Sequence, residues 1–337
     1  MIRHTLFPFQ LAYYSATSLR NWAYDVGLRK AKQVEAKVIS IGNLTVGGTG
    51  KTPMTIFLID ELLKRGLSAG VVSRGYGRLE KGVLEVEISP RAVERFGDEP
   101  VLIKTAHPEI PIFVGEKRSK AAESLLAHKK VDVLIGDDAF QHRALHRDLN
   151  LLLIDATEPL QNYSLLPVGR AREASRPAFS RCDFVVITKC NLVDEATLGK
   201  VKDWVEARTK KPIIQAEYIL KNYRSTLGQK TNELKDKVIL VSGIAKPYAF
   251  EAMLKDKLKI AKHNIYEDHH RYTDLDIEIL LDSASTQGVR WIVTTAKDEV
   301  KLMHFPRLRE RLWVADLSLN LKGELQELYE SLDRLAR

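Results

Sequence analysis

The chain has 337 residues, of which 45% are hydrophobic and 28% charged, so it is long enough for a sizeable core in one large or two medium domains. A net charge of +8 favours an anionic partner, whether a nucleotide, a nucleic acid, an acidic lipid or a phosphorylated substrate. The composition excludes a disordered tail, and two cysteines without metal-like spacing fit a reducing compartment. We expect neither a spanning helix nor a signal peptide, because no apolar run is long enough or suitably flanked.

The N-terminal segment, residues 1–32, is rich in aromatic residues and is flanked by cations. On a helix, Leu19, Trp22, Ala23 and Val26 would share one face. That pattern is typical of an amphipathic helix at a membrane interface, with its rings at headgroup depth and its cations on acidic lipid. A helix packed against the rest of the chain is an equally good interpretation of the composition.

From Lys37 onward, short apolar runs alternate with helical segments. "VISIGN", "SAGVVS", "VDVLIG", "LNLLLID" and "CDFVVIT" are predicted strands, and "KTPMTIFLIDELLKRG" is a predicted helix closed by Gly66. A polar interval at 220–236 is interpreted as a linker or a hairpin, and the alternation resumes after it. This order predicts an α/β fold with a mostly parallel sheet and helices on both faces. The predicted parts are the helix 1–32, a core lobe 33–222 and a smaller α/β lobe 223–337.

The most informative stretch is "ISIGNLTVGGTGKTP", residues 39–53, a glycine-rich loop between a predicted strand and a predicted helix. This context is the one that a phosphate-binding P-loop requires. Lys51 would reach the phosphate oxygens, and the Thr52 hydroxyl would face Mg²⁺. The usual pattern has glycine where this chain has Thr45, and we expect the glycine pair that follows to supply the tight turn. The predicted ATP-binding residues are Thr45, Val46, Gly47, Gly48, Thr49, Gly50, Lys51 and Thr52.

Two carboxylates, Asp137 and Asp138, follow the apolar run "VDVLIG". The end of a buried strand is where a Mg²⁺-associated acid belongs in P-loop folds. Neighbouring side chains diverge at a strand exit, so we expect one carboxylate to meet the metal shell. Taken alone, the pair is more typical of a helix cap or a solvated turn, and the P-loop upstream favours the metal interpretation.

Three further loops carry polar side chains where strands end. "SRGYG" offers Arg74 and Tyr76 for an anionic substrate, "FGDEP" offers Asp98, and "YEDHHRY" offers His269. A carboxylate and an imidazole together would accept a proton from an attacking hydroxyl. The sequence alone does not bring them together. The His-His pair also suggests a metal site, but no third ligand at helical spacing supports one.

These pieces together resemble the tetraacyldisaccharide 4'-kinase family, the lipid A 4'-kinases. The matching segments follow the family order between Gly42 and Leu302: "GNLTVGGTGKTP", "VVSRGYG", "GDEPVLI", "DDAFQHRALHRDLNLLLID", "LLPVGRAREA", "DHHRY" and "TTAKDEVKL". The family carries Thr at the position of Thr45. The resemblance implies Mg²⁺-dependent transfer of phosphate from ATP to the 4'-hydroxyl of a tetraacylated glucosamine disaccharide 1-phosphate. It also implies action on the cytoplasmic face of the bacterial inner membrane, and a substrate with four acyl chains favours the interfacial interpretation of residues 1–32.

The resemblance also implies roles for individual residues. Asp98 and His269 match the family's proposed dyad, Lys51 matches the P-loop lysine, and Asp138, with Asp137 as the second candidate, matches the acids near Mg²⁺. The predicted substrate-binding residues are Arg74, Tyr76, Gln141, His142, Arg172 and Glu173. Two departures affect these expectations. Ala139 stands where the family usually has glycine, and would be strained at a positive φ; Arg170 replaces a proline in the acceptor loop.

Other functional classes fit the sequence less well. A nucleotide-driven switch or metallochaperone ATPase with a deviant P-loop would carry Lys before the glycine pair, where this chain has Val46. A GTPase would carry N-K-x-D, and the closest stretch, "TKCN" at 188–191, lacks its aspartate. A nucleic-acid-binding module finds no aromatic-interleaved basic sheet and no helix-turn-helix pattern. The sequence therefore favours an ATP-using kinase that has no nucleic-acid partner.

Overall fold

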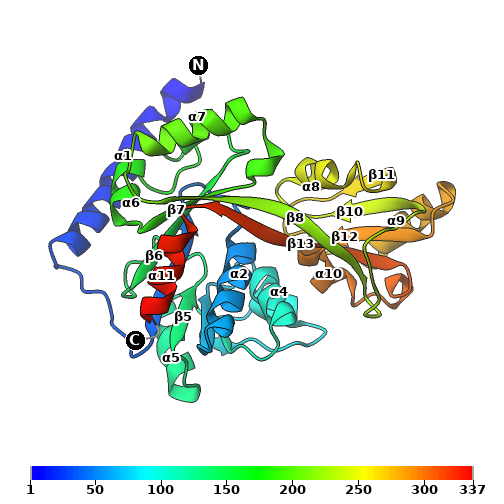
Figure 1. Ribbon diagram of the computed structural model, residues 1–337, viewed down its shortest axis with the longest axis horizontal. Helices are drawn as coiled ribbons and strands as arrows, with labels where there is room; N and C mark the ends of the chain where they lie inside the picture. Colours follow the sequence, from blue (N-terminus) through cyan, green and yellow to red (C-terminus); the bar gives the residue numbers. More distant parts are fainter. Residues whose placement is uncertain (1, 336–337) are drawn as a thin grey trace.

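The fold is built on one mixed sheet, seen in a computed structural model that describes residues 2–335 (Figure 1). Its strands follow the order β11-β10-β12-β13-β8-β7-β6-β1-β5-β2-β4-β3, with β9 paired to β8. Most neighbouring strands are parallel, and the antiparallel pairs are β13 with β8, β3 with β4 and β9 with β8. The strands are β1 (Lys37–Asn43), β2 (Ala69–Ser73), β3 (Leu84–Glu85), β4 (Ile112–Val114), β5 (Val133–Gly136), β6 (Leu149–Asp155), β7 (Phe184–Thr188), β8 (Ile213–Ser225), β9 (Lys230–Thr231), β10 (Lys237–Ser242), β11 (Lys259–Ile265), β12 (Trp291–Thr295) and β13 (Leu312–Gly323).

Helices cover both faces of this sheet, as the sequence predicts. In Figure 1, α6 and α7 lie on one side of the central strands, and α2 and α4 lie on the other. The α-helices are α1 (Ile2–Asp25), α2 (Lys51–Lys64), α3 (Ala92–Phe96), α4 (Asp98–Ala106), α5 (Arg118–His128), α6 (Ser175–Arg181), α7 (Glu195–Glu206), α8 (Pro247–Leu254), α9 (Asp274–Thr286), α10 (Ala296–Leu302) and α11 (Leu325–Leu335).

The core follows from the alternation of side chains along each strand. In β7, Phe184 and Val186 belong to one buried apolar cluster, which also holds residues of α2 and α11. Val185 and Ile187 belong to a second cluster on the opposite face, which holds residues of α6 and α7. Because both faces are covered, the central strands are apolar at nearly every position, which explains their long apolar runs in the sequence.

The two long strands β8 and β13 join the P-loop half of the sheet to the C-terminal half (Figure 1). The polar interval 220–236 forms a hairpin, in which β8 turns back to pair with β9. The expected boundary between residues 222 and 223 falls inside β8. The two halves are therefore connected by shared sheet.

The N-terminal helix α1 lies along the outside of the molecule (Figure 1) and ends at Asp25, before the predicted limit of residue 32. It contacts the rest of the chain through polar groups: Gln10 and Tyr13 donate hydrogen bonds to the carbonyls of Leu165 and Arg172. Three residues of the predicted apolar face are exposed, namely Leu19, Trp22 and Val26, the last just beyond the helix end. Within residues 2–335, no helix is both long and apolar enough to cross a bilayer.

Candidate active site

The P-loop joins β1 to α2, in the predicted strand–loop–helix order. Gly47 and Gly50 have φ values of 121° and 91°, which favour glycine. Gly50 directly precedes α2, so free amides of the first helical turn face the loop. A Cβ at Gly50 would also lie 2.3 Å from the Tyr218 hydroxyl. The loop therefore needs glycine at this position both for its φ and for space.

Thr45 does not need to be glycine, because the backbone around it is strand-like. Thr45 pairs with Ala171 in an antiparallel bridge. On either side, the Arg172 amide donates to the Leu44 carbonyl at 2.7 Å, and the Val46 amide donates to the Arg170 carbonyl at 3.0 Å. The segment 170–172 thus holds the first half of the P-loop, and the expected turn is made by Gly47.

The loop carbonyls are held by the end of β7. The Lys189 ammonium donates to the Gly48 carbonyl at 2.6 Å and lies 2.7 Å from the Asp155 carboxylate. The Thr188 hydroxyl donates to the Thr49 carbonyl. Lys246, which precedes α8, also reaches Asp155, at 3.0 Å. The Val46 and Thr49 amides also donate within the protein, so among the described residues the Gly47, Gly48 and Gly50 amides are the ones that the loop leaves available to an anion.

Asp137 and Asp138 follow β5 and lie in different environments. Asp137 is fully buried, and its oxygens accept hydrogen bonds from the Thr55 and Ser73 hydroxyls. Burial, with Glu99 nearby, raises the pKa of Asp137 to about 7. Asp138 has a positive φ of 49° and accepts two hydrogen bonds from one guanidinium nitrogen of Arg172.

The charge on Asp138 is favoured by surrounding cations. Burial opposes its ionisation, but Lys51, 3.7 Å away, and Arg172 together hold the pKa of Asp138 below its usual value. Arg118, the first residue of α5, donates to the Asp138 carbonyl. Lys51, Arg118 and Arg172 therefore converge on one residue beside the P-loop, which makes this edge of the sheet suitable for phosphate oxygens.

Asp98 and His269 are brought together across 171 positions of the chain, with His269 Nδ1 2.8 Å from Asp98 Oδ2. Asp98 is buried at the start of α4, and His269 has a strained φ of 62°. Burial opposes the charge on Asp98, yet the His269 hydrogen bond and Lys297 lower the pKa of this carboxyl. The same hydrogen bond raises the pKa of His269. Lys297 lies 3.3 Å from His269 Nε2 and pairs with Asp268 at 3.1 Å, so charges of both signs meet in this corner of the site.

Most of the predicted substrate residues surround the same edge. Gln141 donates to the Asn43 carbonyl and to Glu173, whose other oxygen accepts from Asn21 of α1 and from Arg181. His142 is largely buried and surrounded by arginines, and burial lowers its pKa to about 4, so its ring is neutral.

The residues of "SRGYG" lie at the surface. Arg74 is exposed, and Tyr76 is 66% exposed with its ring 5.3 Å from that of His269.

Among the described residues, Thr49 Oγ1, Gln141 Oε1 and His142 Nε2 are buried without a hydrogen-bond partner. Unpaired buried polar atoms of this kind are typical of a site that is completed by a ligand.

The two departures from the family pattern are accommodated. Positive φ falls at Asp138, and Ala139 is not among the residues with positive φ, so the strain expected at Ala139 is absent. The Arg170 side chain reaches Glu158 at 3.3 Å and lies close to Gly47, so it contacts the P-loop region.

Sequence reasoning missed three cations of the site. Lys189 lies in "TKCN", which is considered from sequence only as an incomplete base-reading motif. Lys297 lies in "TTAKDEVKL", one of the segments that match the family, but the resemblance gives this lysine no role. Arg118 follows β4 in "GEKRSK", a basic run that carries no motif. All three lie shortly after a strand, but β4, which precedes Arg118, was not among the predicted strands.

Known proteins are similar to this chain over nearly its whole length. The family model described as tetraacyldisaccharide-1-P 4'-kinase matches residues 2–336. A tetraacyldisaccharide 4'-kinase of Bdellovibrio bacteriovorus is 37% identical with full coverage of both chains, and one of Elusimicrobium minutum is 33% identical over 96% of this chain and 88% of its own. The crystal structure of LpxK from Aquifex aeolicus in complex with ATP aligns with a TM-score of 0.81 at 29% identity, covering 99% of each chain. The chain belongs to the tetraacyldisaccharide-1-P 4'-kinase family.

Proposed function

We propose that this protein transfers the γ-phosphoryl group of ATP to the 4'-hydroxyl of a tetraacylated glucosamine disaccharide 1-phosphate, a precursor of lipid A. The observation that carries the proposal is the Asp98–His269 pair, held at 2.8 Å in a chain that also forms a P-loop. A nucleotide switch needs the P-loop alone. A buried, ionised carboxylate with a positioned imidazole is what an enzyme needs to activate a hydroxyl.

The P-loop and its cations would bind the ATP phosphates. In phosphoryl transfer, charge spreads over the γ-phosphate oxygens, so catalysis rests mainly on positioned positive charge. Lys51 is suited to reach these oxygens from the start of α2. Arg172 is suited to exchange its contact with Asp138 for one with a phosphate, because its half-buried guanidinium belongs to the same cluster and keeps some exposure to solvent.

The residues present also fit Mg²⁺. Within residues 2–335, Asp137 is a buried carboxylate in no ion pair, and its raised pKa is the expected result of a poorly compensated charge. A hard divalent cation would compensate that charge, with Thr52, Asp137 and Asp138 as candidate oxygen donors. When bound, Mg²⁺ supplies neutralisation of charge on the β- and γ-phosphates.

Asp98 would act as the general base. Its lowered pKa keeps it ionised at neutral pH, and the hydrogen bond from His269 fixes the orientation of one oxygen. As the 4'-oxygen bonds to the γ-phosphorus, its proton passes to Asp98, and the bond from phosphorus to the β–γ bridging oxygen breaks to release ADP. His269 and Lys297 would stabilise the negative charge of Asp98 before the transfer.

The lipid substrate would be met at the membrane surface through α1. This helix contacts the protein by polar groups and leaves Leu19 and Trp22 exposed, which suits an interfacial helix on the cytoplasmic face of the inner membrane. In the proposed division, residues 33–222 provide the P-loop and Asp98, and residues 223–337 provide His269 and Lys297.

The test uses γ-labelled ATP with the tetraacyl disaccharide 1-phosphate in detergent. Label should appear in the lipid with wild-type protein, and Lys51→Ala should lower kcat by at least about 100-fold. ATP hydrolysis without labelled lipid would contradict the proposal and favour a nucleotide switch.

A further inference from the structure

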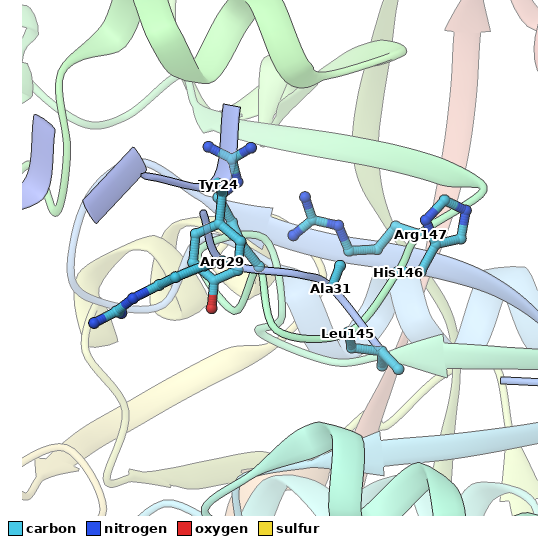
Figure 2. Close-up of a pocket in the computed structure, with 7 residues that line it drawn as sticks. Tyr24, Arg29, Ala31, Leu145, His146 and Arg147 are labelled. Carbon is cyan, nitrogen blue, oxygen red and sulfur yellow. The ribbon is translucent and has the colours of Figure 1, made fainter. Parts of the chain in front are cut away.

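A cavity of about 190 Å³ lies at the foot of α1, outside the site described above (Figure 2). One wall is formed by the end of α1 and the segment after it, and the other by residues 143–147, which follow the Asp137–Asp138 loop. The lining residues are Tyr24, Arg29, Ala31, Arg143, Leu145, His146 and Arg147.

The lining carries an excess of positive charge. Arg143 pairs with Asp25 at 2.6 Å, but within residues 2–335 neither Arg29 nor Arg147 forms an ion pair. Arg147 donates one hydrogen bond, to the Phe140 carbonyl. Burial, with Arg181 and Arg143 nearby, lowers the pKa of Arg147 to about 10, and Glu173, which pairs with Arg181, opposes this shift only in part. A guanidinium that is partly removed from water among other cations is costly unless an anion accompanies it.

The arrangement of the side chains leaves space for such an anion. In Figure 2, Arg147 extends from its backbone toward the Tyr24 side of the cavity, whereas Arg29 extends away from it. Arg29 is exposed, so it is a cation at the mouth that is free to turn toward a bound group. The Arg143 guanidinium lies 5.1 Å from the centre of the Tyr24 ring, which fixes it against the wall.

The chain segment that forms one wall of the cavity also carries exposed apolar side chains. Trp22, Val26 and Leu28 lie close in sequence to the lining residues of this segment and are 52%, 51% and 71% exposed. Exposed apolar side chains on the same segment as a cationic cavity are suited to contact both the acyl chains and the headgroup of a lipid. A nucleic acid or a soluble phosphorylated metabolite has no acyl chains that would bury these apolar side chains.

We propose that this cavity binds the phosphate group of an anionic lipid, with Arg147 and Arg143 at its wall and Arg29 closing over it. The inference rests on the proposed membrane contact of α1. The phosphate has two possible sources that share this chemistry: a phosphodiester lipid of the bilayer, or the 1-phosphate of the acylated substrate.

The experiment compares Arg29→Gln and Arg147→Gln with the control Lys30→Gln in the full-length protein. Lys30 is exposed beside Arg29, carries the same charge and does not line the cavity. Binding is measured by sedimentation with phosphatidylcholine vesicles with and without phosphatidylglycerol. Losing one surface cation costs roughly fivefold in binding to anionic vesicles. The cavity variants should lose about tenfold beyond the control, the scale of one charge-assisted hydrogen bond.

A second arm separates the two sources. The KM for the tetraacyl disaccharide 1-phosphate is measured in neutral detergent, together with that for the same acceptor without its 1-phosphate. Weaker binding to anionic vesicles with an unchanged KM assigns the site to bilayer lipid. A KM that is raised for the acceptor with the 1-phosphate, but not for the acceptor without it, assigns the site to the substrate. Cavity variants that match Lys30→Gln in both arms overturn the proposal.

Arg29 is exposed, so Arg29→Gln should fold even if Arg147→Gln does not, and thermal melting checks both. Label transfer at saturating substrate separates this proposal from the kinase function. Wild-type protein that binds anionic vesicles but never labels the lipid would contradict the kinase function alone.

Discussion

Replacing Asp98 by Asn tests the assignment of the base with little change of shape. The amide oxygen of the new side chain would still accept from the Glu99 amide, which now donates to Asp98 Oδ1 at 2.9 Å, so the start of α4 should persist. The carboxamide cannot accept the hydroxyl proton. Loss of a general base lowers the rate by about 10²- to 10⁴-fold, equivalent to roughly 3–5 kcal/mol of barrier.

The assay is single-turnover label transfer at saturating ATP and lipid, so that binding does not limit the rate. Asp268→Asn is the matched control, because Asp268 lies 3.7 Å from His269 Nε2 and pairs with Lys297 at 3.1 Å. It removes the same charge from the same corner without removing the proposed base. The control should lose less than about tenfold. Asp98→Asn within tenfold of wild type, or equal to the control, would refute the reasoning.

Asp98→Asn should also change how the stability of the protein depends on pH. The hydrogen bond to Asp98 raises the pKa of His269, so the stabilisation from charged His269 is fully present below the unfolded pKa of about 6.5 and is lost as pH rises through the folded pKa. NMR titration should show a lower His269 pKa in Asp98→Asn. The loss of unfolding free energy in this variant should also be larger at pH 6 than at pH 9; an equal loss at both would contradict the linkage.

Gly50→Ala should lose about 1–3 kcal/mol of unfolding free energy by chemical denaturation, because of its φ of 91° and the 2.3 Å approach to the Tyr218 hydroxyl. Adding Tyr218→Phe should recover the steric part only, and a fully stable Gly50→Ala would be inconsistent with the loop conformation. Leu19→Glu should weaken sedimentation with vesicles while leaving the melting temperature nearly unchanged, since Leu19 is 64% exposed. Leu227→Glu, at the exposed β8–β9 turn, should leave vesicle binding unaltered; equal losses in both would argue against α1 as the contact.

The strand–helix alternation predicted the sheet because its central strands are buried on both faces and therefore apolar nearly throughout. The connection between the two halves of the sheet was harder to predict from sequence. β8 has alternating exposure from Ile213 to Ser225, and its second half resembles a polar linker in sequence. Its pairing with β13, from Trp313 to Gly323, is a contact distant in the chain, which local pattern does not encode.

The P-loop was predictable because its chemistry is local: glycines, lysine and helix start lie within a few residues. The Asp98–His269 pair was not, because Asp98 begins α4 whereas His269 lies in the loop between β11 and α9, and their 2.8 Å contact forms across 171 positions of the chain. Only family resemblance suggested it. Lys189 was missed for a similar reason, since its role is a contact with the Gly48 carbonyl and not a motif of its own.

The segment 164–173 touches both the proposed membrane helix and the nucleotide loop. Its carbonyls accept from Gln10 and Tyr13 of α1, and its backbone pairs with Leu44 and Val46. Thermodynamic linkage makes any coupling between the two sites reciprocal. The factor by which a bilayer alters ATP affinity must equal the factor by which ATP alters affinity for the bilayer. A titration of either ligand in the presence of the other would thus measure how strongly this short segment couples the two sites.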